Sequence, residues 1–340
     1  MRTKEEMIFD WAEKLHWIKL DANGTPEFYL DNHMMQTFRA CEAKFWHEFV
    51  EGWSGSGRVW FLDFGIITHK CIEQYYLDRK KPGFDIFQWA GAYARSEWDK
   101  LDMDGEYSTH PDYTKLGGFG GFAAMLCQYA QHFNAENERF RVIGAELYFG
   151  KSKEVPLLDN HLAFEFAPFR LYLSGKIDLL VDDGHSIGPM DHKTARDFRG
   201  GNPMASYEVQ EGMTGYVFAA KKIIENIQGI DRKPCNKIWM NFIQVKGEKV
   251  LGDRFKRMPL YKSDAELEDY RLRMISTVSR IYQLLTNPEL KPNWNTMMCN
   301  NYMHNTCAFQ AVHRQKDAQS QLLVLQSQFV KKEIWNPEKI

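Results

Sequence analysis

The chain has 340 residues, of which 44% are hydrophobic and 26% are charged, a mixture typical of a folded globular protein. This composition excludes wholly disordered, collagen-like, coiled-coil and low-complexity proteins. Its 43 basic and 45 acidic side chains give a net charge of −2, which argues against a strongly basic coat protein and against an acidic tail protein.

The first half of the chain is predicted to be mainly helical, because apolar residues recur there at helical spacing. Helices are expected over residues 31–51, 64–77, 86–101 and 119–133. After residue 139, runs rich in apolar and aromatic residues predict strands over 142–149, 163–169, 171–181 and 186–192. Later helices are expected over 207–227, 264–285 and 319–332, and later strands over 238–245 and 249–260. A central mixed β-sheet flanked by helices, of the α/β or α+β class, is the simplest architecture.

Charge is distributed unevenly between the two parts of the chain. Residues 1–190 carry 20 basic and 29 acidic side chains, whereas residues 191–340 carry 23 and 16. This asymmetry is a weak indication of a surface that faces a polyanion, or of a metal site. No apolar stretch reaches the roughly 20 residues that span a bilayer, and the N-terminal residues contain no signal-peptide core, so we expect a cytoplasmic protein without membrane contact.

Two carboxylates lie within a predicted β-hairpin. Asp178 is in its first strand and Asp191 is in its second, and a tight hairpin can bring the two side chains close together. Close carboxylates repel each other unless a cation lies between them, and oxygen ligands favour Mg²⁺ or Mn²⁺. Lys193 lies on the same face as Asp191 and could orient a metal-bound water or neutralise charge on phosphorus. The hairpin alone supports this site and an ordinary hairpin with exposed charges about equally.

The hairpin resembles the core of the PD-(D/E)XK nuclease superfamily, in its RecB-like branch, which includes phage nucleases and the exonuclease V group. That branch has G-x-x-D on one strand and D-x-K-T after a short hairpin, matched here by residues 175–178 and 191–194. Its upstream G-x-x-x-H helix is matched by residues 65–69. The resemblance implies a restriction-endonuclease-like core with a helical N-terminal part, and a metal-dependent deoxyribonuclease.

The resemblance also implies roles for individual residues. His69, Asp178 and Asp191 would bind Mg²⁺ or Mn²⁺, with the backbone carbonyl of His192 as a further ligand, and Lys193 would assist the attacking water.

Several further positions match the family in chain order. Glu146 matches a glutamate that precedes the core strands, and it would help the metal site or bind DNA. The family has a Q-x-x-x-Y helix after D-x-K, which Gln210 and Tyr216 match only loosely, because five residues separate them. Both are expected to contact DNA.

A stretch of excess positive charge follows the hairpin. Residues 191–262 carry 14 basic and 8 acidic side chains. Basic side chains that neutralise phosphates provide an affinity for DNA that falls with salt. We expect this stretch to form a DNA track that includes Arg196, Arg199, Lys237, Arg254 and Arg257.

Six cysteines in a chain of this length do not predict a disulfide framework for an intracellular protein. Many RecB-like nucleases hold an iron–sulfur cluster with one cysteine before the nuclease core and three after it. Cys41, Cys299 and Cys307 match three of these positions, and His313 stands where the fourth is expected. By resemblance, these residues would bind a [4Fe–4S] cluster, or less favourably zinc, and join the chain ends. The alternative is a lost cluster and free thiols.

The resemblance covers about residues 30–313. We therefore expect an N-terminal extension over residues 1–30, one nuclease domain over 31–313 and a C-terminal helix or tail over 314–340. The implied activity is an exonuclease on single-stranded DNA or DNA ends, with a helicase or recombination partner for any unwinding. The alternatives are a trimming nuclease of CRISPR adaptation, a non-catalytic DNA-binding scaffold and a small-molecule metal hydrolase.

Overall fold

The structure is a computed structural model of the chain. It describes residues 2–55, 60–103, 105–111, 113, 116–150, 162–195, 204–226, 232–246, 251–299 and 307–337. The chain divides into two compact units, each assembled from segments that are far apart in the sequence. Unit 1 comprises residues 1–58, 148–175 and 265–340, and unit 2 comprises residues 59–147 and 176–264. The expected domain ranges do not follow this division and stay a prediction.

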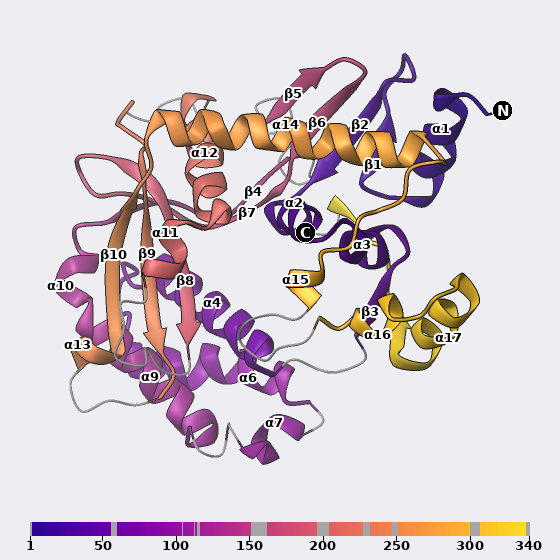
Figure 1. Cartoon of the computed structure of the whole chain (residues 1–340). Helices are drawn as coiled ribbons and strands as arrows, with labels where there is room; N and C mark the ends of the chain where they lie inside the picture. The colour runs from indigo at the N-terminus through magenta and orange to yellow at the C-terminus, as the bar shows by residue number, and fades with distance from the viewer. Residues whose placement is uncertain are drawn as a thin grey trace. The chain divides into compact units, whose positions relative to one another are not determined.

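Within its described residues, unit 2 is built on a mixed sheet of five strands (Figure 1). The strand order is β10 (Phe255–Tyr261), β9 (Lys237–Gln244), β8 (Ile187–Ala195), β7 (Gly175–Asp182) and β4 (Arg141–Phe149). β8 runs antiparallel to β7 and parallel to β9, and β9 runs antiparallel to β10. Because parallel neighbours need a crossover, the chain passes from β8 to β9 through α11 (Ala205–Glu208) and α12 (Glu211–Asn226).

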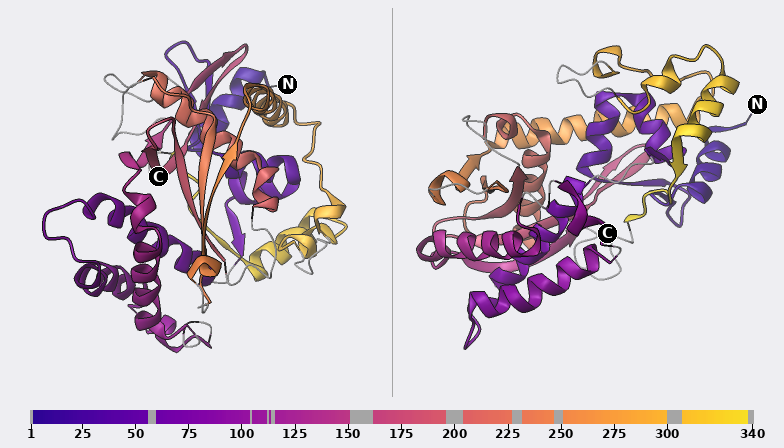
Figure 2. Two further views of the ribbon diagram at one scale, coloured as in Figure 1. Left: turned by 90° about the vertical axis from the view of Figure 1, so that its left-hand side faces the viewer. Right: turned by 90° about the horizontal axis from the view of Figure 1, so that it is seen from below.

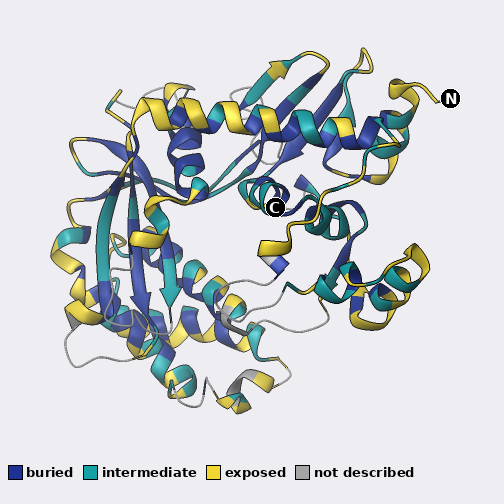
Figure 3. Cartoon of the chain, in the orientation of Figure 1, coloured by how far each residue is buried: buried dark blue, intermediate teal, exposed yellow. Residues whose placement is uncertain are grey.

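Helices of unit 2 cover this sheet. α4 (Trp60–Asp78), α6 (Arg95–Leu101) and α9 (Gly118–His132) share one apolar cluster with Leu179 of β7 and Met190 of β8 (Figure 2). α12 packs against β8 and β9. β9 is buried along nearly its whole length, and β8 is buried from Ile187 to His192 (Figure 3). Consecutive residues of a strand face opposite sides of the sheet, and both sets are buried here, so both faces of these strands are covered. Lys193 is the first partly exposed residue of β8.

The shorter elements of unit 2 connect these layers. They are α5 (Ile86–Trp89), the π-helical turn η2 (Ala90–Ala94), α7 (Glu106–Thr109), α10 (Asn134–Asn137) and α13 (Leu251–Arg254).

Unit 1 contains a second mixed sheet, in the order β1 (Ile18–Leu20), β2 (Pro26–Leu30), β6 (Phe169–Leu173) and β5 (Ala163–Phe166). β2 and β6 run parallel, and the other two pairs are antiparallel. A short ladder joins β3 (Trp53–Gly55) to β11 (Phe329–Lys331). The helical elements are α1 (Lys4–Lys14), α2 (Asn32–Ala40), α3 (Glu42–Phe45), η1 (Trp46–Val50), α14 (Asp264–Thr286), α15 (Thr296–Cys299), α16 (Gln310–His313) and α17 (Ala318–Gln328). Among the described residues, no helix is long and apolar enough to cross a membrane.

The predicted fold class, a mixed sheet flanked by helices, is confirmed. The single strand predicted over residues 171–181 is wrong, because β6 ends at Leu173 and β7 begins at Gly175 in a different sheet. At this junction a Cβ on Gly175 would lie 2.6 Å from the ring of Phe149, so glycine alone allows the close approach. The strand predicted over residues 249–260 begins only at Phe255, after the short helix α13.

Candidate active site

The β7–β8 hairpin carries Asp178 and Asp191 to the point where its ladder ends. The last pair of the ladder is Leu179 opposite Met190, so the two aspartates are the next residue on each strand. The Asp178 carboxylate accepts a hydrogen bond of 3.2 Å from the backbone N–H of His192. The charge of Asp178 also acts on Asp191, so the hairpin brings the two acidic side chains near each other, as the sequence predicts.

Helix α4 presents His69 and Glu73, which lie one turn apart on the same face. His69 Nδ1 is 3.0 Å from Asp178 Oδ2. One ligand atom from each of His69, Glu73 and Asp178 lies within 4.8 Å of the other two. Glu73 is only 3% exposed, and its Oε1 has no hydrogen-bond partner. An imidazole nitrogen with two carboxyl groups, one of them holding an unsatisfied buried oxygen, fits a Mg²⁺ or Mn²⁺ ion, whose binding would displace any proton from the carboxyl groups.

A hydrogen bond joins Glu73 to Glu146. Burial, followed by the hydrogen bond to Glu146, raises the pKa of Glu73 to about 9. The same hydrogen bond lowers the pKa of Glu146, whose Oε1 is also 3.0 Å from Lys176 Nζ. Glu146 has a φ of 49°, a left-handed conformation that is uncommon for a residue with a side chain. Its hydrogen bond to Glu73 places Glu146 next to the cluster, and its role in the site stays a prediction.

Lys193 binds the second aspartate of the hairpin. Its Nζ lies 2.7 Å from Oδ2 and 2.9 Å from Oδ1 of Asp191. Burial raises the pKa of Asp191, and the charge of Asp178 raises it further, although Lys193 opposes both effects. Burial works against the charge on Lys193, but the Asp191 carboxylate outweighs it and raises the pKa of the ammonium. Asp191 thus holds the lysine, whereas the cluster of potential ligand atoms consists of His69, Glu73 and Asp178.

The His192 side chain points away from Asp191 and Lys193, because successive strand residues face opposite sides. It is fully buried, and Asn241 Nδ2 lies 3.0 Å from its Nδ1. Arg257 donates to the Asn241 oxygen, so the amide nitrogen of Asn241 must be the group that faces His192. The His192 Nδ1 is therefore an acceptor, and burial lowers the pKa of this imidazole to about 3. The role of the His192 carbonyl as a metal ligand stays a prediction.

The predicted DNA-contacting residues lie around α12 or outside the described residues. Gln210 is exposed between α11 and α12, and Tyr216 is half-buried within α12. Arg196 and Arg199 lie outside the described residues. Their contact with DNA stays a prediction.

Much of the predicted basic DNA track is buried. The Arg257 side chain is 1% exposed, and Arg254 and Lys237 are 6% and 8% exposed. Lys237 pairs with Asp183 at 2.6 Å, and Arg254 donates to backbone carbonyls at 3.0 and 2.9 Å. The expected track is therefore wrong at these three positions, because their charges satisfy partners inside unit 2.

Two residues beside the site have no place among the predicted catalytic residues. The sequence places Glu73 one helical turn after His69 and on the same face, although the family motif assigns it no role. Tyr207 of α11 is close enough to Lys193 and Asp191 for both charges to act on it, while burial raises its pKa. No sequence signal separates Tyr207 from the other aromatic residues.

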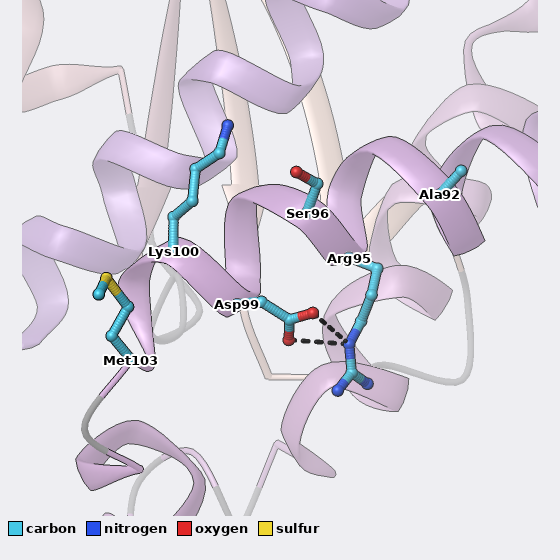
Figure 4. Close-up of a pocket in the computed structure, with 6 residues that line it drawn as sticks. All are labelled: Ala92, Arg95, Ser96, Asp99, Lys100 and Met103. Atoms are coloured by element: carbon cyan, nitrogen blue, oxygen red, sulfur yellow. Dashed lines mark hydrogen bonds and ion pairs between the residues drawn. The ribbon is translucent and has the colours of Figure 1, made fainter.

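A shallow surface depression in unit 2 is separate from these residues (Figure 4). It is lined by Ala92, Arg95, Ser96, Asp99, Lys100 and Met103. Arg95 and Asp99 pair with each other at 2.8 Å inside it. None of the described catalytic candidates lines it, so it is not the candidate active site.

In unit 1, the four predicted cluster ligands lie in one neighbourhood, but no three of them bring ligand atoms within 4.8 Å of one another among the described residues. Cys299 Sγ is 4.0 Å from His313 Nδ1. Burial raises the pKa of Cys299, and the neighbouring Cys307 and Cys41 raise it further. His313 Nε2 is buried without a hydrogen-bond partner, and burial, together with the nearby His47, lowers the pKa of this imidazole to about 4. Thiolates and imidazole are ligand types that iron–sulfur clusters and zinc accept, so binding of either group by these residues stays a prediction.

A mixed sheet whose hairpin ends in two aspartates and a lysine, beside a helical histidine, defines a nuclease-like fold and site. The model of the PD-(D/E)XK nuclease superfamily matches residues 34–312, and the chain belongs to this superfamily. Among solved structures, a candidate exonuclease from Eubacterium rectale is similar over 82% of this chain and 88% of its own, with 11% identity and a TM-score of 0.43. The structure of SSO0001 is similar over 63% of this chain and 86% of its own, with 12% identity and a TM-score of 0.27. No curated protein matches the chain.

Replacing Glu73 by glutamine should flatten the pH dependence of stability, measured by urea unfolding in EDTA. The pKa of the carboxyl is about 9 in the fold, against 4.5 for an ordinary glutamate. Its favourable contribution is complete below pH 4.5 and is lost as the pH rises toward 9, by on the order of 1 kcal/mol per pH unit, because only the folded chain keeps the proton. Glu73→Gln has no such proton, and exposed Glu138→Gln should behave as wild type. Equal slopes for Glu73→Gln and wild type would contradict a protonated Glu73.

Proposed function

We propose that this protein is a metal-dependent deoxyribonuclease of the RecB-like branch, acting as an exonuclease on single-stranded DNA or DNA ends. The observation that carries this proposal is the cluster of His69, Glu73 and Asp178 beside the Lys193–Asp191 pair. Membership of the nuclease superfamily supports phosphodiester hydrolysis. The G-x-x-x-H, G-x-x-D and D-x-K-T motifs support the branch. A separate helicase or recombination partner would supply any unwinding.

His69, Asp178 and Glu73 would hold the metal ion, with Asp191 and the His192 carbonyl as further ligands. When bound, Mg²⁺ or Mn²⁺ polarises a phosphoryl oxygen and makes a bound water more acidic. The Lys193 ammonium stays charged beside Asp191, where it can stabilise negative charge that develops on the phosphoryl oxygens or orient the attacking water. Asp191 positions that ammonium through two oxygen contacts.

Cleavage of labelled nucleic acids with Mg²⁺, Mn²⁺ or EDTA tests this function. We expect metal-dependent loss of end label from linear single-stranded DNA, slower loss from linear duplexes and little cleavage of closed circles. EDTA should abolish cleavage. RNA of the same sequence tests whether the protein distinguishes deoxyribose from ribose. Intact DNA in every metal would contradict the nuclease and favour the non-catalytic scaffold. Rapid nicking of closed circles would contradict the exonuclease.

We further propose that Cys41, Cys299, Cys307 and His313 bind a [4Fe–4S] cluster. Protein purified without oxygen should then contain about four iron and four sulfide ions per chain and absorb visible light. Cys299→Ser and His313→Ala should lose the iron and unfold at lower temperature, because cluster binding contributes folding free energy. Cys127→Ser, which alters a cysteine of unit 2, should keep the iron. Zinc without iron would contradict the cluster but keep the site, and protein without either metal would contradict the site.

A further inference from the structure

A groove with a volume of about 610 Å³ lies in unit 1, outside the candidate active site. The end of α2, the middle of α14 and residues 293–297 form its walls. Three arginines line it, Arg39, Arg273 and Arg280, whereas Glu42 is the one carboxylate among the described lining residues. The lining residues therefore include more basic than acidic side chains, and they lie outside the basic stretch of residues 191–262.

Hydrogen bonds between the walls fix the shape of the groove. Arg280 donates to both carboxylate oxygens of Glu42, at 3.0 and 3.3 Å. The same carboxylate accepts the backbone N–H of Asn293 at 2.8 Å. The Asn295 side chain donates to the backbone carbonyl of Ala40 at 3.1 Å. Arg280 and Glu42 thus act as a structural pair that ties residues 293–295 to the helices.

The remaining side chains suit a phosphate and a base. Arg39 is half-buried and donates to the Thr277 hydroxyl at 3.1 Å. Arg273 is 44% exposed and pairs at the rim with Asp269, one helical turn away. A planar guanidinium matches the geometry of phosphate oxygens and binds them more specifically than an ammonium does. An exposed rim pair contributes little energy, so a phosphate can compete for Arg273.

Trp294 supplies an exposed aromatic surface next to these arginines. It is 50% exposed, although its ring also makes an edge contact with His313, with the centroids 5.2 Å apart. A half-exposed tryptophan that is held at its edge presents the rest of its ring to solvent. Basic grooves with such aromatic platforms bind unpaired nucleic acid, since every base has a face that stacks.

We propose that this groove binds single-stranded nucleic acid, with backbone phosphates on Arg39 and Arg273 and a base stacked on Trp294. The choice of nucleic acid follows from the charge excess of the lining, together with the exposed indole. The choice of a single strand follows because bases in a duplex already stack on each other and are closed to Trp294. The choice of nucleic acid as the ligand rests in part on the proposed function. Binding in the groove does not itself require cleavage.

Fluorescence anisotropy with a labelled oligothymidylate in EDTA tests the groove under conditions that suppress metal-dependent cleavage. Arg273→Gln and Trp294→Ala should each weaken binding by about fivefold to tenfold, while Trp294→Phe should keep most of the affinity. Arg273→Gln should also lower the slope of log Kd against log salt by about 0.7, the value for one phosphate contact on a single strand. Arg271→Gln is the matched control, because Arg271 lies on the same helix, pairs with Glu268 and does not line the groove.

Wild-type affinity and salt dependence in both groove variants would overturn the proposal, once circular dichroism shows that both are folded. Equal affinity for a hairpin duplex would overturn the assignment to single strands. The same experiments distinguish failure of the nuclease proposal from failure of the groove proposal. Metal-dependent cleavage by wild type with unaffected binding in the variants rejects the groove alone. Absence of cleavage with weakened binding in the variants rejects the nuclease and retains the groove.

Discussion

Lys193→Ala should lower the rate of metal-dependent DNA cleavage by about 10²- to 10⁴-fold while the protein stays folded. The Lys193 side chain is 28% exposed, so its loss leaves no closed cavity. The Asp191 side chain is only 5% exposed and would lose its bound ammonium while Asp178 still faces it. The pKa of Asp191 should then rise further, and the positive group that opposes charge on the phosphoryl oxygens would be missing.

Single-turnover cleavage of single-stranded DNA at saturating Mg²⁺ measures this effect without product release. Lys222→Ala is the matched control, because Lys222 is a lysine of α12 that pairs with Glu225 on its own helix. It should cleave as wild type does. A Lys193→Ala rate within a factor of about three of wild type would remove the lysine from the mechanism, since a positioned catalytic group contributes far more.

Arg257→Leu should destabilise the protein by about 3–5 kcal/mol, because several buried oxygens lose a donor and each group left unsatisfied costs about 1–3 kcal/mol. Its guanidinium donates to Asn137 at 3.0 Å and to the hydroxyls of Tyr76 and Tyr129 at 2.6 and 3.2 Å, in addition to Asn241. Without Arg257, these buried oxygens lose a donor. The Asn241 amide would also lose the contact that orients it toward His192.

Urea unfolding at neutral pH measures this change, and exposed Arg271→Gln should shift the midpoint little. The second readout is the His192 imidazole, whose Nδ1 should stop being a uniform hydrogen-bond acceptor in folded Arg257→Gln, as nitrogen NMR can detect. A loss of less than about 1 kcal/mol in Arg257→Leu would mean that the network contributes little to stability.

The sequence predicts the candidate catalytic residues better than it predicts the residues that hold them in place. Asp178, Asp191 and Lys193 are close in the chain, so hairpin geometry alone brings them together, as the ladder confirms. His69 needed a family motif, because a lone helical histidine carries no signal for what it faces. Asn241 and Arg257 could not be found, because their partners come from α4, β8 and α9 and only folding assembles them.

The DNA track that was predicted from the basic residues shows the same limit of prediction from sequence. Counting basic residues along the chain indicated a track that contains Arg254 and Arg257, but a charge count does not tell whether an arginine meets solvent or a buried acceptor. Arg39 and Arg273, which line the groove of unit 1, come from separate segments and leave no run in the sequence. Hydrophobic patterns likewise joined β6 to β7, because apolar residues continue on both sides of the junction and do not indicate that the two strands pair in different sheets.

The division of the chain has a consequence for synthesis on the ribosome. Unit 2 ends at residue 264, whereas unit 1 needs segments from both ends of the chain. Since the N-terminal part emerges first, unit 2 can fold while unit 1 still lacks α14 and the C-terminal segment. Cys41 is then synthesised long before Cys299 and Cys307, which follow unit 2 in the sequence. A metal site that needs all three cysteines can therefore form only after unit 2 has been synthesised.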